Sequence, residues 1–190
     1  YVFIIGAGDR MRDGVLSRVA EMLPAGASFV YGDAYLERYD FLMAGPLEKP
    51  DFIKSNICQQ SIFYERGVFD LLGGFDLRYS VFADWAFNMK CFADPRLRKV
   101  YLGLIVADFE GWGLSDMQED AQFVKDFPGL IRKYVGASHY LRYRIYLTRV
   151  SAYRFRQGLL GFAKEVATQP AALFRRQKPR GLQGKADTTR

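Results

Sequence analysis

Short apolar runs alternate along the chain with segments whose apolar positions recur at helical spacing. The runs at residues 1–5 ("YVFII") and 28–33 ("SFVYGD") are rich in β-branched and aromatic residues, which predicts buried strands, the second ending at Asp33. Asp13 is placed to cap a helix between them. One face of this helix would carry the apolar side chains Val15, Leu16, Val19, Met22 and Leu23. Strand, helix and strand in this order predict an α/β unit.

The pattern then becomes irregular before it resumes. Residues 37–56 have no clean period and include two prolines, so we expect a long loop. The later pattern predicts a strand at 58–64, a short helix closed by glycine at 65–74, a helix at 83–93 and a strand at 98–110. The glycine-rich stretch "GWGLS" follows. Its Ser115 and the later Gln118 have the spacing of a capping box, which predicts a further helix towards Lys125.

Towards the end of the chain, arginines alternate with tyrosines and aliphatic residues at roughly helical spacing. Residues 140–190 carry 12 Lys and Arg against 2 Asp and Glu, whereas residues 1–139 carry 15 against 19. The change predicts a main domain over 1–135, a basic aromatic helical extension over 136–178 and a disordered tail over 179–190.

The basic extension allows three interpretations. It can lie on an anionic membrane, with arginines towards the headgroups and tyrosines and aliphatic side chains at the interface. It can pack as a helical appendage with its arginines in solvent, or it can bind nucleic acid. We favour the membrane, and we expect no nucleic-acid partner because no recognisable binding module accompanies the charge.

Composition narrows the classes of protein that fit. Hydrophobic residues make up 49% of the 190 residues, which is enough for one ordered core. Two cysteines without CxxC spacing and a single histidine, His139, exclude a zinc cluster, a His-rich metal site and a disulfide framework. We therefore expect a reducing, cytoplasmic setting, with peripheral contact to the inner face of the membrane. No signal peptide or membrane-spanning stretch is visible, and His139 receives no functional role.

The stretch "IIGAGDRM", near the start, has competing interpretations. It could open a dinucleotide-binding loop of the GxGxxG kind, with Asp33 near the place of a ribose-binding acid. However, Met11 occupies the third glycine position, and the Asp9 carboxylate would repel a phosphate at the helix start. We therefore favour the alternative, in which Gly6 and Gly8 clear space around Asp9. A plain turn beside a solvated acid is the third interpretation.

Four stretches follow one another in a characteristic order. They are "FIIGAGDRM", "FVYGDAYL", "ICQQSIFYERGVFDLLGGFDLRYSVFADWAFNMKCF" and "GWGLS". Together they cover about residues 1–130 and resemble family 2 glycosyltransferases of the GT-A fold, in a branch that serves bacterial polysaccharide biosynthesis. Gln59 stands where this branch usually has His, and Trp112 lies inside the glycine turn. The resemblance implies a GT-A-like (Rossmann-like) α/β nucleotide-sugar transferase fold, whose amino-terminal part would precede Tyr1.

The resemblance also implies roles for individual residues. Asp9, with Gly8 beside it, would bind Mg²⁺ or Mn²⁺ on the diphosphate of a nucleotide sugar, where the cation neutralises the leaving group. Asp84 would be the general base that takes the proton of the acceptor hydroxyl. The residues implied to contact donor or acceptor are Asp33, Gln59, Gln60, Trp85, Trp112 and Ser115.

Two local effects on Asp84 oppose each other. An aromatic neighbour, Trp85, would desolvate the carboxylate and raise its pKa, whereas the amino end of a helix would lower it. The sequence leaves the net shift open. An ordinary acid at a helix start is the alternative to a catalytic one.

Together these patterns predict a metal-dependent, inverting glycosyltransferase. It would move a sugar from a nucleotide-sugar donor to a saccharide or lipid-linked saccharide acceptor in cell-surface polysaccharide biosynthesis. The main alternative is a non-catalytic saccharide- or membrane-binding protein that keeps a degenerate GT-A fold. A dinucleotide-binding oxidoreductase is a weaker alternative.

Overall fold

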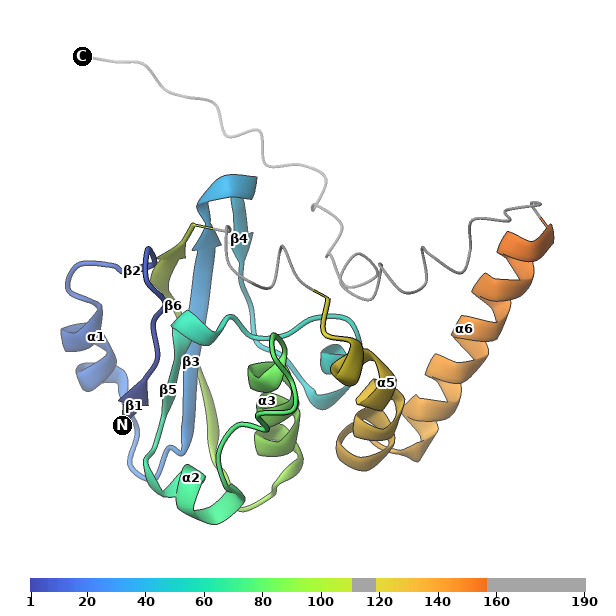
Figure 1. The fold of residues 1–190 in the computed structure, drawn as a ribbon. Helices are drawn as coiled ribbons and strands as arrows, with labels where there is room; N and C mark the ends of the chain where they lie inside the picture. The colour runs from blue at the N-terminus through green and yellow to red at the C-terminus, as the bar shows by residue number, and fades with distance from the viewer. Residues whose placement is uncertain (111–118, 157–190) are drawn as a thin grey trace.

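The computed structural model describes residues 1–110 and 119–156, with side chains as far as residue 150. In this part of the chain, a six-stranded sheet has the order β1-β5-β3-β6-β2, and β4 pairs with the end of β3. The strands are β1 (Val2–Phe3), β2 (Arg10–Met11), β3 (Phe29–Leu36), β4 (Phe41–Met43), β5 (Ile62–Tyr64) and β6 (Lys99–Phe109). The α-helices are α1 (Val15–Met22), α2 (Gly67–Leu72), α3 (Ala83–Ala93), α5 (Ala121–Leu130) and α6 (Ala137–Arg156). The predicted α/β class is confirmed (Figure 1).

The long strands β3 and β6 form the centre of the sheet and run parallel, so their carboxyl ends meet at one edge. β5 pairs antiparallel with both β3 and β1, and β2 pairs antiparallel with the end of β6. The register of β3 and β6 shifts around Asp33. There a Cβ on Gly32 would come 2.3 Å from the carbonyl oxygen of Leu104, so only glycine allows this close approach. Because β5 separates β1 from β3, the predicted strand–helix–strand unit does not pair its own strands.

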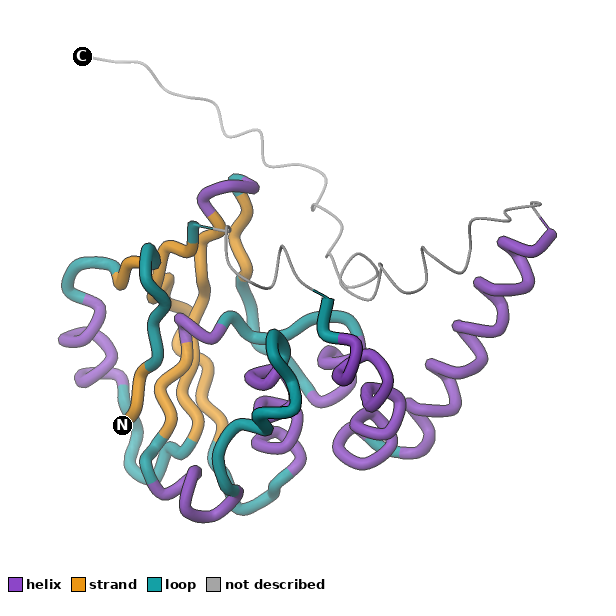
Figure 2. The backbone as a smooth tube through the Cα atoms, viewed as in Figure 1, coloured by secondary structure: helices purple, strands orange, loops and turns teal. Residues whose placement is uncertain are grey.

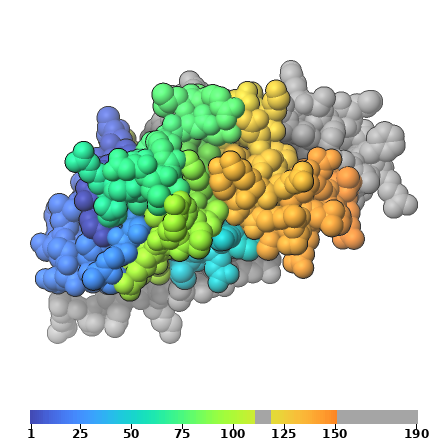
Figure 3. Space-filling model, turned by 90° about the horizontal axis from the view of Figure 1, so that it is seen from below, coloured from blue at the N-terminus to red at the C-terminus, as the bar shows by residue number. Residues whose placement is uncertain are grey.

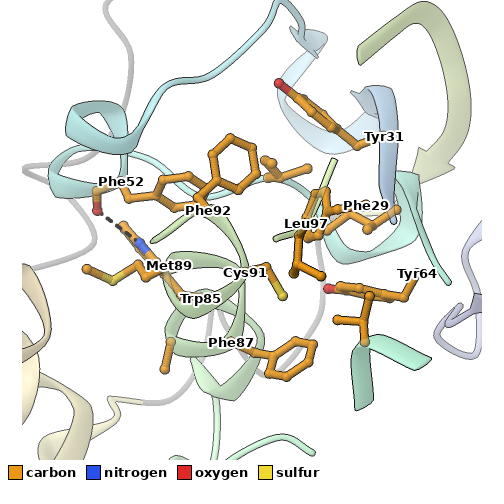
Figure 4. Close-up of a cluster of buried hydrophobic side chains, with 14 of the residues drawn as sticks. Phe29, Tyr31, Phe52, Tyr64, Trp85, Phe87, Met89, Cys91, Phe92 and Leu97 are labelled. Carbon is orange, nitrogen blue, oxygen red and sulfur yellow. Dashed lines mark hydrogen bonds between the residues drawn. The ribbon is translucent and has the colours of Figure 1, made fainter. Parts of the chain in front are cut away.

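The two faces of the sheet are covered by different helices (Figure 2). On the face covered by α1, the buried side chains include Val15, Val19, Val30, Phe63 and Val106. The larger core lies on the other face, under α2, α3 and α5. In it the ring of Phe29 meets the rings of Tyr64 and Phe92 edge to face, at centroid distances of 5.2 and 5.3 Å (Figure 4). Such aromatic contacts add to the stabilisation from area burial alone.

Helix α3 is buried on most of its circumference. Seven of its 11 residues are buried, and Asn88 in its middle has no exposed surface. A buried amide is costly unless hydrogen-bond partners reach it inside the protein. The sequence pattern predicted this helix correctly, but it did not show that Asn88 lies inside.

Several predicted boundaries in the first third of the chain are wrong. β3 continues beyond Asp33 to Leu36, because β4 and the end of β6 pair with its last residues. The loop predicted over residues 37–56 contains β4 and two 3₁₀ helices, Glu37–Tyr39 and Lys49–Ile53. Short strands and 3₁₀ turns of this kind are too brief to produce a detectable period.

The first strand and helix also differ from expectation. The strand is confined to Val2–Phe3 and is partly exposed at the edge of the sheet. Asp13 does not cap α1, because the N-cap is Gly14 at φ 72° and no side chain bonds the helix start. Leu16 and Met22, expected on the buried face, are exposed.

Helix α5 begins at Ala121, later than the start predicted from the capping pair. The proposed capping pair, Ser115 and Gln118, lies outside the described residues. The cap is Asp120, whose Oδ1 accepts a hydrogen bond of 2.9 Å from the backbone N–H of Phe123. A π-helical turn at Ile131–Val135 then leads to α6.

The predicted basic helix is present as α6, which lies at one end of the described body (Figure 3). Its Tyr140 and Tyr143 pack against the larger core, and its outer face is open. Within residues 1–110 and 119–156, no helix combines the length and the apolar character needed to cross a bilayer. The predicted domain boundaries remain predictions.

Candidate active site

Asp84 is the second residue of α3 and keeps part of its surface exposed. Its Oδ2 accepts a hydrogen bond of 2.8 Å from Nδ2 of Asn56. Burial of the carboxylate raises its pKa to about 6, against the opposing effect of hydrogen bonds from the backbone N–H of Trp85 and from Asn56. The net shift in the pKa of Asp84, which the sequence left open, is therefore upward. An acid in this state can accept a proton near neutral pH, as a general base must.

Behind Asp84, a chain of polar side chains crosses the aromatic core. Asn88 donates from Nδ2 to Oδ1 of Asn56 at 2.9 Å. The hydroxyl of Tyr64 lies 2.8 Å from Oδ1 of Asn88 and 3.2 Å from Oε1 of Gln59. Asn88 and Tyr64 are fully buried. The position of Asp84 thus depends on α3, on β5 and on the segment that precedes β5.

Asp9 lies between β1 and β2, next to the carboxyl end of β6. Its Oδ2 accepts a hydrogen bond of 2.6 Å from Nε2 of Gln60, and its Oδ1 lies 3.4 Å from the backbone nitrogen of Glu110. A Cβ on Gly6 would come 2.6 Å from Oδ2 of Asp9. At Gly8, which has φ 98°, a Cβ would come 2.9 Å from Oε2 of Glu110. The two glycines therefore leave space for two carboxylates, in agreement with the second interpretation of this stretch.

The segment Cys58–Gln60 connects the surroundings of the two acids. The Cys58 thiol donates to Oε1 of Gln60 at 3.0 Å, and Gln60 in turn holds Asp9. Burial raises the pKa of Cys58 to about 12, and the negative charges of Asp84 and Asp9 also act to raise it. Asp9, Asp84 and this segment form the candidate cluster: Asp9 accepts a hydrogen bond from Gln60, and the charge of Asp84 acts on Cys58.

Asp33 has two hydrogen-bond partners within the fold. It lies inside β3 and is buried, and its Oδ1 accepts hydrogen bonds from the Tyr101 hydroxyl at 2.7 Å and the Gly45 backbone N–H at 3.0 Å. These bonds attach the chain after β4 to the sheet. The predicted end of the strand at Asp33 is wrong, because β3 continues to Leu36, whereas the predicted contact of Asp33 with donor or acceptor remains a prediction.

Trp85 was predicted to contact substrate, but it lies in the core with 5% of its surface exposed. Its indole N–H donates to the carbonyl oxygen of Phe52 at 3.0 Å (Figure 4). The start of α3 is covered by α5, and the Trp85 ring packs against Phe123 and Phe127 of that helix. Trp112 and Ser115, which were also predicted to contact donor or acceptor, lie outside the described residues.

The carboxylates around Asp9 are too few to bind a cation without further ligands. Among the described residues, no three His, Cys, Asp or Glu side chains lie together as a metal-binding group. Asp9 has Glu110 beside it, so the chain offers two carboxylates here. Mg²⁺ is commonly bound through one or two carboxylates, with phosphate and water as its other ligands. The residues present therefore fit an ion that arrives with a diphosphate.

The sequence did not indicate four residues that build this site: Asn56, Tyr64, Asn88 and Glu110. Asn88 carried a signal, because a polar residue among apolar neighbours on a helix marks a buried hydrogen-bond network. Glu110 follows the last residue of a predicted strand, where ligand-binding side chains gather in α/β folds. Asn56 and Tyr64 carried no comparable signal.

Comparison with known proteins supports the resemblance at a general level. Two proteins named "PGL/p-HBAD biosynthesis glycosyltransferase", from Mycobacterium bovis and Mycobacterium tuberculosis, are 37% identical to the chain over 133 residues. The alignment covers 67% of this chain and 52% of each relative, so the chain spans about half the length of the curated relatives it matches. No protein-family model matches. The chain is thus similar to named glycosyltransferases, at a level that does not separate families or folds among them.

The raised pKa of Asp84 predicts a change in stability. The folded protein disfavours the ionised acid, so this cost is absent below about pH 4 and complete above about pH 6. Asp84→Asn removes the charge and can still accept the bond from Asn56. We expect the variant to be more stable than the wild type by roughly 2 kcal/mol at pH 7.5, with the difference shrinking towards zero near pH 4.

Urea unfolding of both proteins across this pH range measures the difference. Asp70→Asn, at an exposed acid of α2, is the matched control and should change stability by less than about 0.5 kcal/mol at either pH. Equal stability of wild type and Asp84→Asn at pH 7.5 would contradict the desolvation of Asp84.

Proposed function

We propose that this chain forms the catalytic and acceptor-side part of a glycosyltransferase of the GT-A fold, in family 2. The enzyme would transfer a sugar from a nucleotide-sugar donor to a saccharide or lipid-linked saccharide, with inversion at the anomeric carbon. The observation that carries the proposal is the cluster of Asp84 and Asp9 around Cys58–Gln60. The similarity to two glycosyltransferases named for PGL/p-HBAD biosynthesis supports the class of reaction.

In the proposed reaction, Asp84 acts as the general base. The acceptor hydroxyl oxygen forms a bond to the anomeric carbon of the donor, and the bond from that carbon to the diphosphate oxygen breaks. The hydroxyl proton passes to the Asp84 carboxylate, and the nucleoside diphosphate leaves with the electron pair. The pKa of about 6 supports this role, because the acid is ionised at neutral pH yet basic enough to accept a proton.

Asp9 and Glu110 would hold Mg²⁺ or Mn²⁺ at the other end of the cluster. Such an ion neutralises developing charge on a diphosphate leaving group. Gln60 would keep the Asp9 carboxylate oriented through its 2.6 Å hydrogen bond. The partly exposed Gln59 and Gln60 lie between the two acids, so an acceptor sugar would contact this segment.

Turnover of nucleotide sugars by the full-length protein tests the proposal. With Mn²⁺ and a panel of donors, we expect release of nucleoside diphosphate from at least one of them. Asp84→Asn should lower kcat by about 10²–10⁴-fold, the range found for general bases. Asp9→Ala should weaken activation by Mn²⁺, whereas Asp70→Asn should behave as the wild type. Wild-type rates in Asp84→Asn would refute its role, and an absence of turnover with every donor would favour a non-catalytic saccharide-binding protein.

Helix α6 supports a membrane-bound acceptor. It exposes Leu141 (59%), Ile145 (43%) and Tyr146 (49%), and Arg142 and Arg144 are exposed beside them. The sequence from residue 127 to residue 156 contains no Asp or Glu. Apolar side chains among uncompensated arginines suit the interface of an anionic membrane. The enzyme would thereby work next to a lipid-linked substrate.

Sedimentation with vesicles measures this contact. The full-length protein should bind vesicles of phosphatidylglycerol and phosphatidylcholine, and it should bind phosphatidylcholine alone only weakly. Replacing Arg142, Arg144 and Arg149 together by Gln should weaken binding more than tenfold, since each basic residue contributes about 1 kcal/mol. The same replacement at the exposed Arg18, Lys54 and Arg66 is the charge-matched control. Equal binding by both triple variants would exclude α6 as the contact surface.

A further inference from the structure

The polar side chains behind Asp84 form a continuous series, here named the amide relay. Its members are Asn56, Asn88, Tyr64 and Gln59. Each neighbouring pair lies between 2.8 and 3.2 Å apart, and the series begins at the carboxylate and ends at a buried amide. Because Asn88 and Tyr64 have no exposed surface, water cannot replace a partner that either one loses. The relay must therefore satisfy its hydrogen bonds internally.

The protons available in the relay determine which side chain donates and which accepts in each of its hydrogen bonds. This order of donors and acceptors is the direction of the relay. An ionised Asp84 can only accept, so Asn56 must turn its NH₂ group towards it and its carbonyl oxygen towards Asn88. Asn88 must then donate to Asn56, and its own carbonyl oxygen must accept from the Tyr64 hydroxyl. An amide that donates with one end necessarily accepts with the other, so each member imposes its direction on the next.

At the end of the relay away from Asp84, the orientation of the Gln59 amide determines this direction. The Tyr64 hydroxyl has one proton, yet it faces two acceptors, Asn88 Oδ1 and Gln59 Oε1. In addition, Nε2 of Gln59 is buried and has no hydrogen-bond partner among the described residues. Turning the Gln59 amide by half a rotation resolves the conflict, because its NH₂ group then donates to the Tyr64 oxygen. Oxygen and nitrogen of an amide have nearly the same shape, so the hydrogen-bond network decides between the two orientations.

We propose that the amide relay acts as one unit that sets the direction of the hydrogen bond reaching Asp84, which makes Asn88 and Tyr64 positioning residues for this acid. Its catalytic meaning rests on the proposed function, but the coupling itself does not. With Gln59 donating, every bond points towards Asp84 and the ionised acid has its donor. With Gln59 accepting, the Tyr64 proton points away, both Asn amides turn, and Asn56 presents its carbonyl oxygen to Asp84. In that direction only a protonated Asp84 is satisfied.

Three other titratable groups lie near Asp84 in the described structure. They are Cys58 before β5, Tyr64 in β5, and Asp120 at the start of α5, which binds the backbone N–H groups of Val81 and Phe82. Burial raises the pKa of Cys58 to about 12 and that of Tyr64 well above its ordinary value. Both therefore keep their protons while Asp84 titrates, and the relay changes direction without ionising.

The variant Gln59→Glu tests the coupling, because an ionised carboxylate at this position can only accept. It should draw the Tyr64 proton towards itself, reverse the relay and raise the pKa of Asp84 by about one unit, a tenfold change in proton affinity. The carboxyl ¹³C shift of Asp84 in the full-length protein measures this pKa, with the signal identified by its loss in Asp84→Asn. The added negative charge also acts through space, so a second variant must separate the two effects.

Tyr64→Phe separates these two effects, because it removes the hydroxyl that links Gln59 to Asn88 and leaves the added negative charge at position 59 unchanged. Most of the shift caused by Gln59→Glu should disappear in the Tyr64→Phe background and persist in Tyr79→Phe. Tyr79 is a buried tyrosine of the same core whose hydroxyl bonds Asp126 instead. An equal shift with and without the Tyr64 hydroxyl would overturn the relay.

A measurement on the wild type covers the case in which Tyr64→Phe fails to fold. The side-chain NH₂ signals of Gln59 and Asn88 should titrate with the same midpoint as the Asp84 carboxyl carbon. A Gln59 signal that stays constant through this titration would also overturn the relay. The proposed function fails separately: if Asp84 is not the base, the relay signals still share the NMR midpoint of Asp84, but the pH dependence of transfer by the wild type has no midpoint at that value.

Discussion

The hydrogen bond from Asn56 to Asp84 is the interaction on which the arrangement of this site depends. An acid at the start of a buried helix, against an aromatic core, is costly to ionise unless a donor reaches it. Asn56 supplies that donor, while its carbonyl oxygen accepts from Asn88, whose own carbonyl oxygen accepts from Tyr64. The polar series thus explains why an amide and a phenol hydroxyl lie in an otherwise apolar core. It also ties α3 and β5 to one geometry around a single carboxylate.

The sheet brings the second acid to the same place. β3 and β6 are parallel, and the chain leaves β6 at Glu110, beside Asp9. The short strand β5 returns antiparallel between β1 and β3, so the segment Cys58–Gln60 that precedes it also reaches this edge. Two acids separated by most of the domain's sequence therefore share neighbours. This edge is where α/β folds commonly bind their ligands.

Sequence reasoning predicted the parts of this structure that have a strong local signal. The helix at α3, the glycine-closed helix α2 and the long strand β6 were predicted close to their observed bounds, because each has a clear period or terminator. Asp9 and Asp84 were identified by resemblance, and their roles remain predictions. The strand β4 and the continuation of β3 past Asp33 were missed, and the first strand was predicted too long and too buried, because distant pairing partners determine these features. Asn88 stood out as a polar residue in an apolar helix, but its bonds to Asn56 and Tyr64 join segments far apart in the sequence, which no local pattern reveals.

The pH dependence of the proposed sugar transfer by the wild-type protein tests most directly whether a desolvated Asp84 takes the acceptor proton. The measurement is kcat/KM with saturating Mn²⁺ between pH 4.5 and pH 8. We expect the rate to fall on the acid side with an apparent pKa of about 6, the value to which burial raises the pKa of Asp84. A rate that stays level down to pH 4.5 would contradict it.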